Sequence, residues 1–281
     1  MKTRELIKEF EKHLYERHLS ENTVRSYTFA TRQFFKKFRK LNTTNLNFYK
    51  VFLIDNYKPQ TVNSRIRAIN CLIDYLNDKE DCADWYKPVK HLSTIKLQQK
   101  TYLENVISKG DYEYLKKCLK RDDRLRWYFI VHFMGSTGVR VSELIQMKIE
   151  HLETGYMDIC SKAGKARRVL IPEKLCKEAL AWYYSQGITS GFIILNNRGN
   201  VITPRGIGSQ LKYFAGKYKI KESTVYPHSF RHRFAKNFLE KSSDIALLAD
   251  LLGHDSIETT RIYLKKTGPE QMNMINKIVT W

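Results

Sequence analysis

The chain has 281 residues and carries 49 Lys and Arg against 29 Asp and Glu, a formal net charge of +20 at pH 7. Hydrophobic residues make up 42% of it and aromatic residues 12%, which excludes a wholly disordered protein. No run approaches the roughly 18 apolar residues of a membrane span, so no membrane partner is expected. The charge excess favours a polyanionic partner, above all nucleic acid.

The positive charge is spread along the whole chain. Residues 1–90 hold 18 Lys and Arg against 11 Asp and Glu, and residues 91–281 hold 31 against 18. Both parts are therefore expected to face a polyanion, although a generally solubilising surface is the plainer alternative. The five cysteines are odd in number and form no Cys-x-x-Cys pair, which indicates reduced thiols in a cytoplasmic protein.

Residues 1–85 are predicted to form an all-helical module. Apolar residues recur at helical spacing over residues 3–18, and Ser20 is positioned as the N-cap of a second helix. Helices over residues 45–55 and 61–76 complete the module. Its exposed basic faces carry four candidate DNA-contact residues: Arg25, Arg32, Arg65 and Arg67.

A change of pattern separates this module from the rest of the chain. Residues 86–103 lose the helical periodicity and are predicted to be an extended basic linker. A second segment, residues 104–281, begins with a helix capped by Ser108 and continues with an apolar helix over residues 127–134. This segment is therefore expected to have a core of its own.

The remainder of the second segment mixes one hairpin with helices. After Arg140 a helix is predicted to end near residue 149, and the apolar period then changes to two. Residues 156–160 and 168–171 flank a polar loop and predict a β-hairpin. A further strand is predicted at residues 193–195. Helices are expected over residues 204–217, 229–240, 243–252 and 256–264, with a short amphipathic helix in the tail 269–281.

Two clusters in the last quarter of the chain carry groups suited to phosphate chemistry. His228 and Arg231 stand one helical turn apart, and Tyr263 follows Leu252-Gly253-His254 by nine residues after the histidine. Arg140 lies upstream at a predicted helix start. Arginine binds two phosphate oxygens with its planar fork and stays charged. Singly, each residue has a plainer role: a surface arginine, a glycine C-cap, a tyrosine in a core.

A zinc site is the alternative use of these histidines. His228 and His232 have the i, i+4 spacing of two ligands. Arg231 lies between them, and its permanent positive charge disfavours a bound cation. No metal site is therefore predicted.

In chain order, these residues match a known pattern. The chain resembles the tyrosine recombinases, that is, the phage integrases and Xer-type site-specific DNA recombinases, over nearly its whole length. The resemblance implies a mainly α fold, with a helical (SAM-like) core-binding domain at 1–85 and a mostly helical catalytic domain at 104–281. The catalytic domain of this family, the DNA breaking-rejoining enzyme fold, holds a small antiparallel β-sheet. The residues that carry the match are Arg140, Lys162, His228, Arg231, His254 and Tyr263.

The resemblance also implies a role for each of these residues. Tyr263 would attack the scissile phosphate to give a 3′-phosphotyrosine, and His228 would help to accept its proton. Arg140 and Arg231 would clamp the phosphate, and His254 would hydrogen-bond one of its oxygens.

Two further residues are assigned through the same resemblance. Lys162, in the hairpin loop, would protonate the departing 5′-oxygen, with Lys165 of the same loop as the alternative. Glu143 would orient the active-site groups from behind Arg140, although a simple helix salt bridge would also explain it. No cofactor is implied, because the bond exchange is nearly isoenergetic.

The expected partner is double-stranded DNA with a specific core site, held in a clamp by both domains. Candidate contacts on the catalytic side are Arg205, Gln210 and Lys212. A homotetramer on DNA is implied, in which the tail 269–281 docks onto a neighbouring protomer or folds back in cis. Such a protein would be cytoplasmic and associated with the nucleoid. A type IB topoisomerase and a non-catalytic DNA-binding regulator are the alternative functions.

Overall fold

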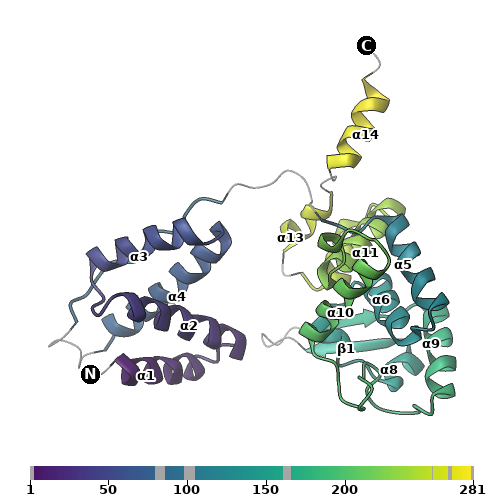
Figure 1. The fold of residues 1–281 in the computed structure, drawn as a ribbon, viewed down its shortest axis with the longest axis horizontal. Helices are drawn as coiled ribbons and strands as arrows, with labels where there is room; N and C mark the ends of the chain where they lie inside the picture. Colours follow the sequence, from purple (N-terminus) through teal and green to yellow (C-terminus); the bar gives the residue numbers. More distant parts are fainter. Residues whose placement is uncertain are drawn as a thin grey trace. The chain divides into compact units, whose positions relative to one another are not determined.

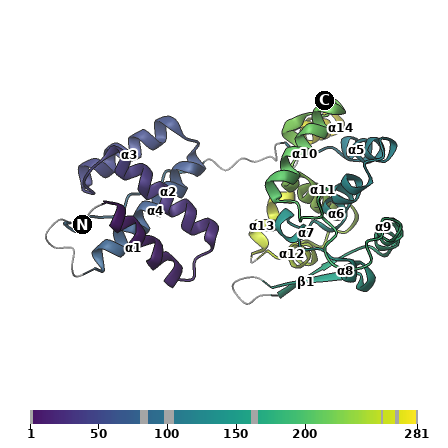
Figure 2. The same cartoon turned by 60° about the horizontal axis from the view of Figure 1, so that its bottom comes forward.

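The computed structural model describes residues 3–79, 86–97, 105–160, 166–254, 256–264 and 268–279. The chain divides into two compact units, Met1–Gln99 and Lys100–Trp281. Figures 1 and 2 show the helices of each unit from two directions. None of the helices that the structure describes is long and apolar enough to span a membrane.

The described part of the first unit contains four helices packed around an apolar core. The side chain of Ser20 accepts a hydrogen bond from the Thr23 backbone N–H at 3.2 Å, which confirms the predicted N-cap. Large apolar side chains such as Phe10, Phe34 and Tyr49 are fully buried between the helices. The helices are α1 (Thr3–Glu16), α2 (Glu21–Lys37), α3 (Thr43–Asn56) and α4 (Pro59–Asn77).

Residues 86–97 differ from the predicted linker, because they pack against the first unit. The segment has no helix or strand, as expected, but Tyr86 and Leu92 join the apolar core of α1–α4. The side-chain amide of Asn70 pairs with both backbone groups of Leu92, at 2.9 Å each. Asn63 pairs with the backbone of Ile95 in the same way, at 2.9 and 2.8 Å. Two asparagines of α4 therefore hold this segment in place.

The second unit is built around one apolar helix, α6. This helix packs against α5, α9 and α11, and its residues from Tyr128 to Met134 are mostly buried. The Ser108 side chain caps α5 by accepting from the Asp111 backbone N–H at 2.9 Å, as predicted. The first elements of the unit are α5 (Lys109–Arg121), α6 (Leu125–Thr137), α7 (Val141–Leu144), α8 (Ile149–Thr154), β1 (Tyr156–Cys160), β2 (Ala166–Leu170) and α9 (Glu173–Ser185). The later ones are α10 (Pro204–Lys217), the 3-10 turn η2 (Glu222–Thr224), α11 (Pro227–Lys241), α12 (Ile245–Leu252), α13 (Ile257–Arg261), the 3-10 turn η3 (Ile262–Leu264) and α14 (Gly268–Ile278).

The strands β1 and β2 form the predicted antiparallel hairpin. Tyr156 pairs with Leu170 and Cys160 with Ala166, so β2 begins two residues earlier than the sequence indicates. The mainly α fold with a small antiparallel sheet is confirmed. Because side chains alternate along a strand, the neighbouring residues Arg167 and Arg168 point to opposite faces of the hairpin.

Two sequence-based expectations on this unit were wrong in detail, and one helix was not predicted. The helix predicted from Arg140 to Ile149 is divided into α7 and α8, because the Ile149 N–H bonds to the Gly191 carbonyl at 2.9 Å instead of to a carbonyl one turn earlier. Residues 193–195 form no strand, and Leu195 makes only an isolated bridge to Val201. The helix α9 was not predicted at all.

Candidate active site

The Gly138 turn at the end of α6 supplies the first part of the site. Gly138 ends the helix in a left-handed conformation (φ 64°), and Arg140, two residues later, is the N-cap of α7. Glu143 of α7 accepts from the Arg140 backbone N–H at 2.8 Å and from Arg140 Nη1 at 2.9 Å. Arg140 is therefore held by its own helix, and 37% of its side chain remains exposed.

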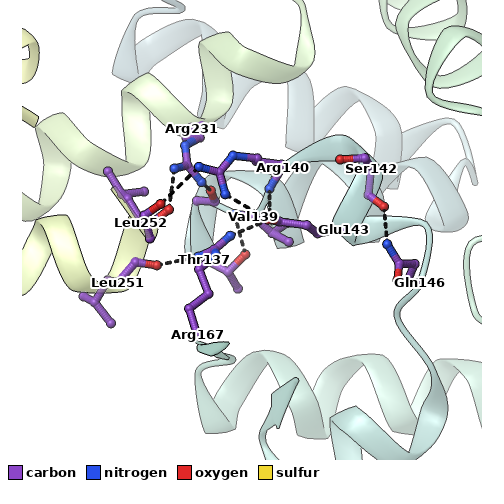
Figure 3. A network of polar contacts seen from close by, with 12 residues as sticks. Thr137, Val139, Arg140, Ser142, Glu143, Gln146, Arg167, Arg231, Leu251 and Leu252 are labelled. Carbon is purple, nitrogen blue, oxygen red and sulfur yellow. Dashed lines mark hydrogen bonds and ion pairs between the residues drawn. The ribbon is translucent and has the colours of Figure 1, made fainter. Parts of the chain in front are cut away.

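Arg231 of α11 lies at the centre of the site and is buried. Its Nη1 donates to the Gly138 carbonyl at 2.7 Å, and its Nη2 donates to the Leu252 carbonyl at 2.6 Å (Figure 3). Burial and the nearby charge of Arg140 lower the pKa of Arg231 to about 10, so the guanidinium stays charged at neutral pH. The two turns at Gly138 and Leu252 are thus joined by one cation.

His254 follows the end of α12 and faces Arg231. Its Nε2 lies 3.1 Å from Arg231 Nη2, and its Nδ1 lies 2.7 Å from the hydroxyl of Thr260. Since a guanidinium can only donate, Nε2 must accept this hydrogen bond, and the proton of the neutral ring is then on Nδ1. Thr260 therefore fixes the orientation of the ring.

Tyr263 lies on η3, directly against this histidine. Its ring stacks on His254 with centroids 6.0 Å apart, and the ring of His232 meets it edge-on at 5.3 Å. Only 6% of the residue is exposed. Burial raises the pKa of the phenol, while the charge of Arg231 and a hydrogen bond from it act in the opposite direction. The hydroxyl is thus placed beside the guanidinium of Arg231.

His228 occupies the first turn of α11, one turn before Arg231. It is exposed at the surface of the site. Partial desolvation lowers the pKa of His228, and the charges of Arg231 and Arg140 act in the same direction. The imidazole is therefore neutral at pH 7 and available to accept a proton.

The structure thus brings together Arg140, Arg231, His254 and Tyr263, with His228 at their edge. Lys162 and its alternative Lys165 lie outside the described residues. In the described parts of the chain, no group of three His, Cys, Asp or Glu side chains is arranged to hold a metal ion.

Sequence reasoning missed one charged residue of this site, Arg167. Its side chain is 11% exposed and pairs with Glu143, while the adjacent Arg168 is 52% exposed and pairs with Asp158 at 2.8 Å. The alternation of side chains along a strand could have identified Arg167, because this residue shares the inward face of β2 with the buried Val169. An inward arginine on a two-stranded sheet needs a buried partner.

The candidate DNA-contact residues differ in their exposure and in their partners within the chain. Arg205 and Lys212 of α10 are exposed, as are Arg25, Arg32 and Arg67 of the first unit, and Gln210 is half-buried. Arg65 is half-buried, donates to Gln33 Oε1 at 2.8 Å and lies over the rings of Phe29 and Tyr57. Arg25 pairs with Glu21 at 2.6 Å, and Arg32 lies 3.8 Å from Glu11.

Comparison with known proteins assigns the chain to a family. Residues 105–268, more than half of the chain, match the model of the phage integrase family. The chain is 27% identical over 288 residues to the tyrosine recombinase XerA of Pyrococcus furiosus, covering 98% of this chain and 96% of that protein. It is 30% identical over 212 residues to the tyrosine recombinase XerC of Pseudomonas putida KT2440, covering 73% of this chain and 69% of that protein.

Solved structures share the fold. The crystal structure of XerA recombinase matches with a TM-score of 0.52 and 25% identity over 98% of both chains. XerH bound to its palindromic difH substrate in a post-cleavage complex matches with a TM-score of 0.72 and 18% identity, over 100% of this chain and 85% of that one. A lambda integrase tetramer bound to a Holliday junction matches with a TM-score of 0.70 and 16% identity, over 92% and 76%. The chain therefore belongs to the phage integrase family and is a tyrosine site-specific recombinase.

Proposed function

We propose that this recombinase cleaves and rejoins DNA strands at a specific duplex site through a 3′-phosphotyrosine intermediate and a Holliday junction, as a tetramer on two DNA sites. The observation that carries the proposal is the position of the Tyr263 hydroxyl beside Arg231, with Arg140 and His254 around it. The solved complexes of XerH after cleavage and of lambda integrase on a Holliday junction, which share this fold, support the same reaction.

The chemical step exchanges one ester bond for another. The Tyr263 oxygen forms a bond to the scissile phosphorus as the bond from phosphorus to the 5′-oxygen breaks. The phenol proton passes to His228, and Lys162 gives a proton to the departing 5′-oxygen. Rejoining reverses these transfers with the 5′-hydroxyl of another strand, so neither cofactor nor external energy is needed.

The electrostatics of the site suit this step. A phenol with a raised pKa is a poor nucleophile, and it needs a base and a positive field at the moment of attack. His228 is neutral at pH 7 because its pKa is lowered, so it can act as the base. Arg231 stays charged at neutral pH, and together with Arg140 it offsets the charge that builds on the phosphate in the transition state.

The exposed basic residues are the proposed contacts to the duplex. Arg25, Arg32 and Arg67 would bind phosphates from the first unit, and Arg205 and Lys212 from α10 of the second, with Gln210 beside them. Arg65 contacts Gln33 and Phe29, and Arg25 and Arg32 pair with Glu21 and Glu11, so these partners compete with a DNA contact. A protein with these contacts would be found with the nucleoid.

A covalent trapping experiment tests the proposal. A nicked duplex bearing the correct site loses a short fragment after cleavage, so the protein–DNA adduct accumulates. We expect the adduct with the wild-type protein and none with Tyr263→Phe, which lacks the nucleophilic oxygen. Relaxation of supercoiled DNA without sequence preference would instead indicate a topoisomerase. Site binding without an adduct would indicate a regulator.

The tail is proposed to dock onto a neighbouring protomer in the tetramer. The helix α14 exposes the apolar side chains of Met272, Ile275 and Ile278, which suits burial against another protein surface. A cyclic exchange of four such helices would close a ring of identical contacts. Deleting residues 269–281 should leave adduct formation on one site intact and abolish pairing of two sites. Normal recombination by the truncated protein would rule this docking out and favour folding back in cis.

A further inference from the structure

Arg167 links two turns of the candidate site that are distant in sequence. From β2, its Nη2 donates to Glu143 Oε2 on α7, and its Nη1 donates to the Leu251 carbonyl at the end of α12 at 2.6 Å (Figure 3). With only 11% of the side chain exposed, neither contact is a loose surface pair. A planar guanidinium can donate to two such partners at once, because its N–H groups have fixed directions. The ammonium group of a lysine lacks this fixed geometry.

Each partner of Arg167 also determines the position of a clamp arginine. The carboxylate of Glu143 holds Arg140 in place by accepting hydrogen bonds from the Arg140 backbone N–H and from Arg140 Nη1. The turn that begins at Leu251 continues with Leu252, whose carbonyl accepts from Arg231, and with Gly253, whose carbonyl accepts from Arg140 Nη2 at 3.3 Å. Arg167 therefore contacts Glu143 and the Leu251–Gly253 turn, which hold the two clamp arginines in place. None of these hydrogen bonds joins Arg167 to Arg140 or Arg231 directly.

The backbone around Gly253 is packed against the Arg167 side chain. Gly253 has φ 62°, and a Cβ atom built on it would lie 2.1 Å from Arg167 Cδ. The α12 turn can approach this closely only because residue 253 has no side chain. The methylene stem of Arg167 thus forms one wall of the turn that precedes His254.

The carboxylate of Glu143 is shared between two arginines. Arg167 occupies Oε2, together with the Arg140 backbone N–H, and leaves Oε1 to the Arg140 side chain. Burial alone would raise the pKa of Glu143, but the hydrogen bond from the Arg140 backbone and the charge of Arg167 bring it below the ordinary value. Without Arg167, both oxygens and the full negative charge of Glu143 would be directed at Arg140. The carboxylate would then compete with a bound phosphate for the Arg140 guanidinium.

We infer that Arg167 is a positioning residue for the phosphate clamp: it occupies one oxygen of Glu143 and anchors the Leu251–Gly253 turn, so that Arg140 and Arg231 both face the scissile phosphate. This inference rests on the proposed phosphotyrosine reaction. Arg167 acts through Glu143 and the turn, without contact to the reacting atoms.

The test compares two substrates. On a nicked duplex with an ordinary scissile phosphate, Arg167→Ala should form the covalent adduct about 30- to 100-fold more slowly than wild type, at saturating DNA and with unchanged binding. On a duplex whose scissile phosphate is a methylphosphonate, one charged oxygen is replaced by methyl, and the clamp has less charge to offset. On this substrate Arg167→Ala should form the adduct at most about threefold more slowly than wild type, because the function that the variant has lost is charge stabilisation.

Two further variants complete the experiment. Arg167→Lys keeps the charge but cannot bond to Glu143 and the Leu251 carbonyl with one rigid fork, so its rate should fall between those of wild type and Arg167→Ala. Arg168→Ala is the matched control, because it removes the adjacent arginine from the exposed face of the same strand and should match wild type on both substrates. Circular dichroism checks that each variant is folded.

The outcomes separate this inference from the proposed function. An Arg167→Ala rate equal to wild type on the ordinary phosphate would overturn it, and so would an equal deficit on both substrates, which indicates a merely structural role. If Arg167→Ala does not fold, Arg167→Lys decides the question by the same comparison of substrates. An absence of adduct with the wild-type protein on the ordinary phosphate would count against the phosphotyrosine reaction itself.

Discussion

The two units of this recombinase bury polar groups of different kinds. In the described part of Met1–Gln99, the buried polar residues are Thr28, Thr31 and Asn63, all neutral and all hydrogen-bonded to backbone. In the described part of Lys100–Trp281, four charged residues are buried: Glu143, Arg231, Arg233 and Lys236. A buried charge lowers stability unless hydrogen bonds and an opposite charge compensate it. In the second unit, opposite charges compensate Glu143, and hydrogen bonds to backbone carbonyls compensate Arg231.

Two of these four charges lie at the candidate site. Arg231 and Glu143 lie within the network that surrounds Tyr263, where the proposed attack on the phosphate needs a positive field. Arg233 is different, because its Nε donates to the Ile107 carbonyl at 2.8 Å and so fixes the start of the unit. A buried charge thus indicates function only where it or the residues that it contacts lie against a proposed reacting group. The contrast is therefore between a first unit whose described buried polar residues are neutral and a second unit that buries charges around its candidate site.

Replacing Arg231 should have the largest effect. Arg231→Ala removes half of the clamp, and we expect the rate of adduct formation to fall by about 1,000-fold or more. It also leaves the Gly138 and Leu252 carbonyls without their donor, at a cost of about 1–3 kcal/mol each. Single-turnover trapping and chemical denaturation measure the two effects. A variant that still cleaves within tenfold of wild type would end the claim that this buried charge serves the reaction.

Gly253→Ala tests how tightly the centre of the second unit is packed. The new Cβ would meet Arg167 in a conformation that already strains alanine, so we expect a loss of about 2–3 kcal/mol of stability together with slower cleavage. Gly155→Ala is the control, because Gly155 also has positive φ (81°) but no atom lies within 4 Å of the added Cβ. It should cost about 1 kcal/mol and leave cleavage unchanged. Equal losses for both variants would show that close packing at Gly253 contributes nothing.

The sequence predicts several groups that the structure brings together at the candidate site, because their spacing along the chain is short. His228 and Arg231 share one helical turn, and Tyr263 follows His254 within nine residues, so the family pattern reports them directly. Helix starts were predicted equally well at Ser20 and Ser108, where one side chain satisfies the first turn.

What the sequence could not predict depends on partners far along the chain. Arg167 bonds to residues 24 and 84 positions away, and no short motif reports such a pair. The Asn70–Leu92 and Asn63–Ile95 pairs likewise join α4 to a segment without periodicity, which looked like a linker. In both cases a polar side chain replaces regular secondary structure as the means of holding two segments together.

Acidification should destabilise the second unit through His232. Burial and the charges of His228, Arg231 and Lys236 lower the pKa of His232 to about 4, against about 6.5 in an unfolded chain. Between these values the unfolded state binds more protons, so the free energy of unfolding falls as the pH drops below 6.5. We expect a loss of about 2 kcal/mol from pH 7 to about 4.5 through this residue. Thermal unfolding of His232→Phe should show a correspondingly smaller loss, and an identical pH dependence would contradict the assignment.

Asn70→Ala in the first unit should have the smallest effect and completes the contrast. It removes both hydrogen bonds to the Leu92 backbone, and we expect a loss of about 1 kcal/mol of stability. Asn56→Ala is the control, because that amide bonds only to the Phe52 carbonyl of its own helix. At saturating DNA, both variants should form the adduct at the wild-type rate, because neither alters a charge near Tyr263. A slower chemical step in Asn70→Ala, with the second unit intact, would mean that packing of residues 86–97 also governs the active site, and the separation between the two units would then fail.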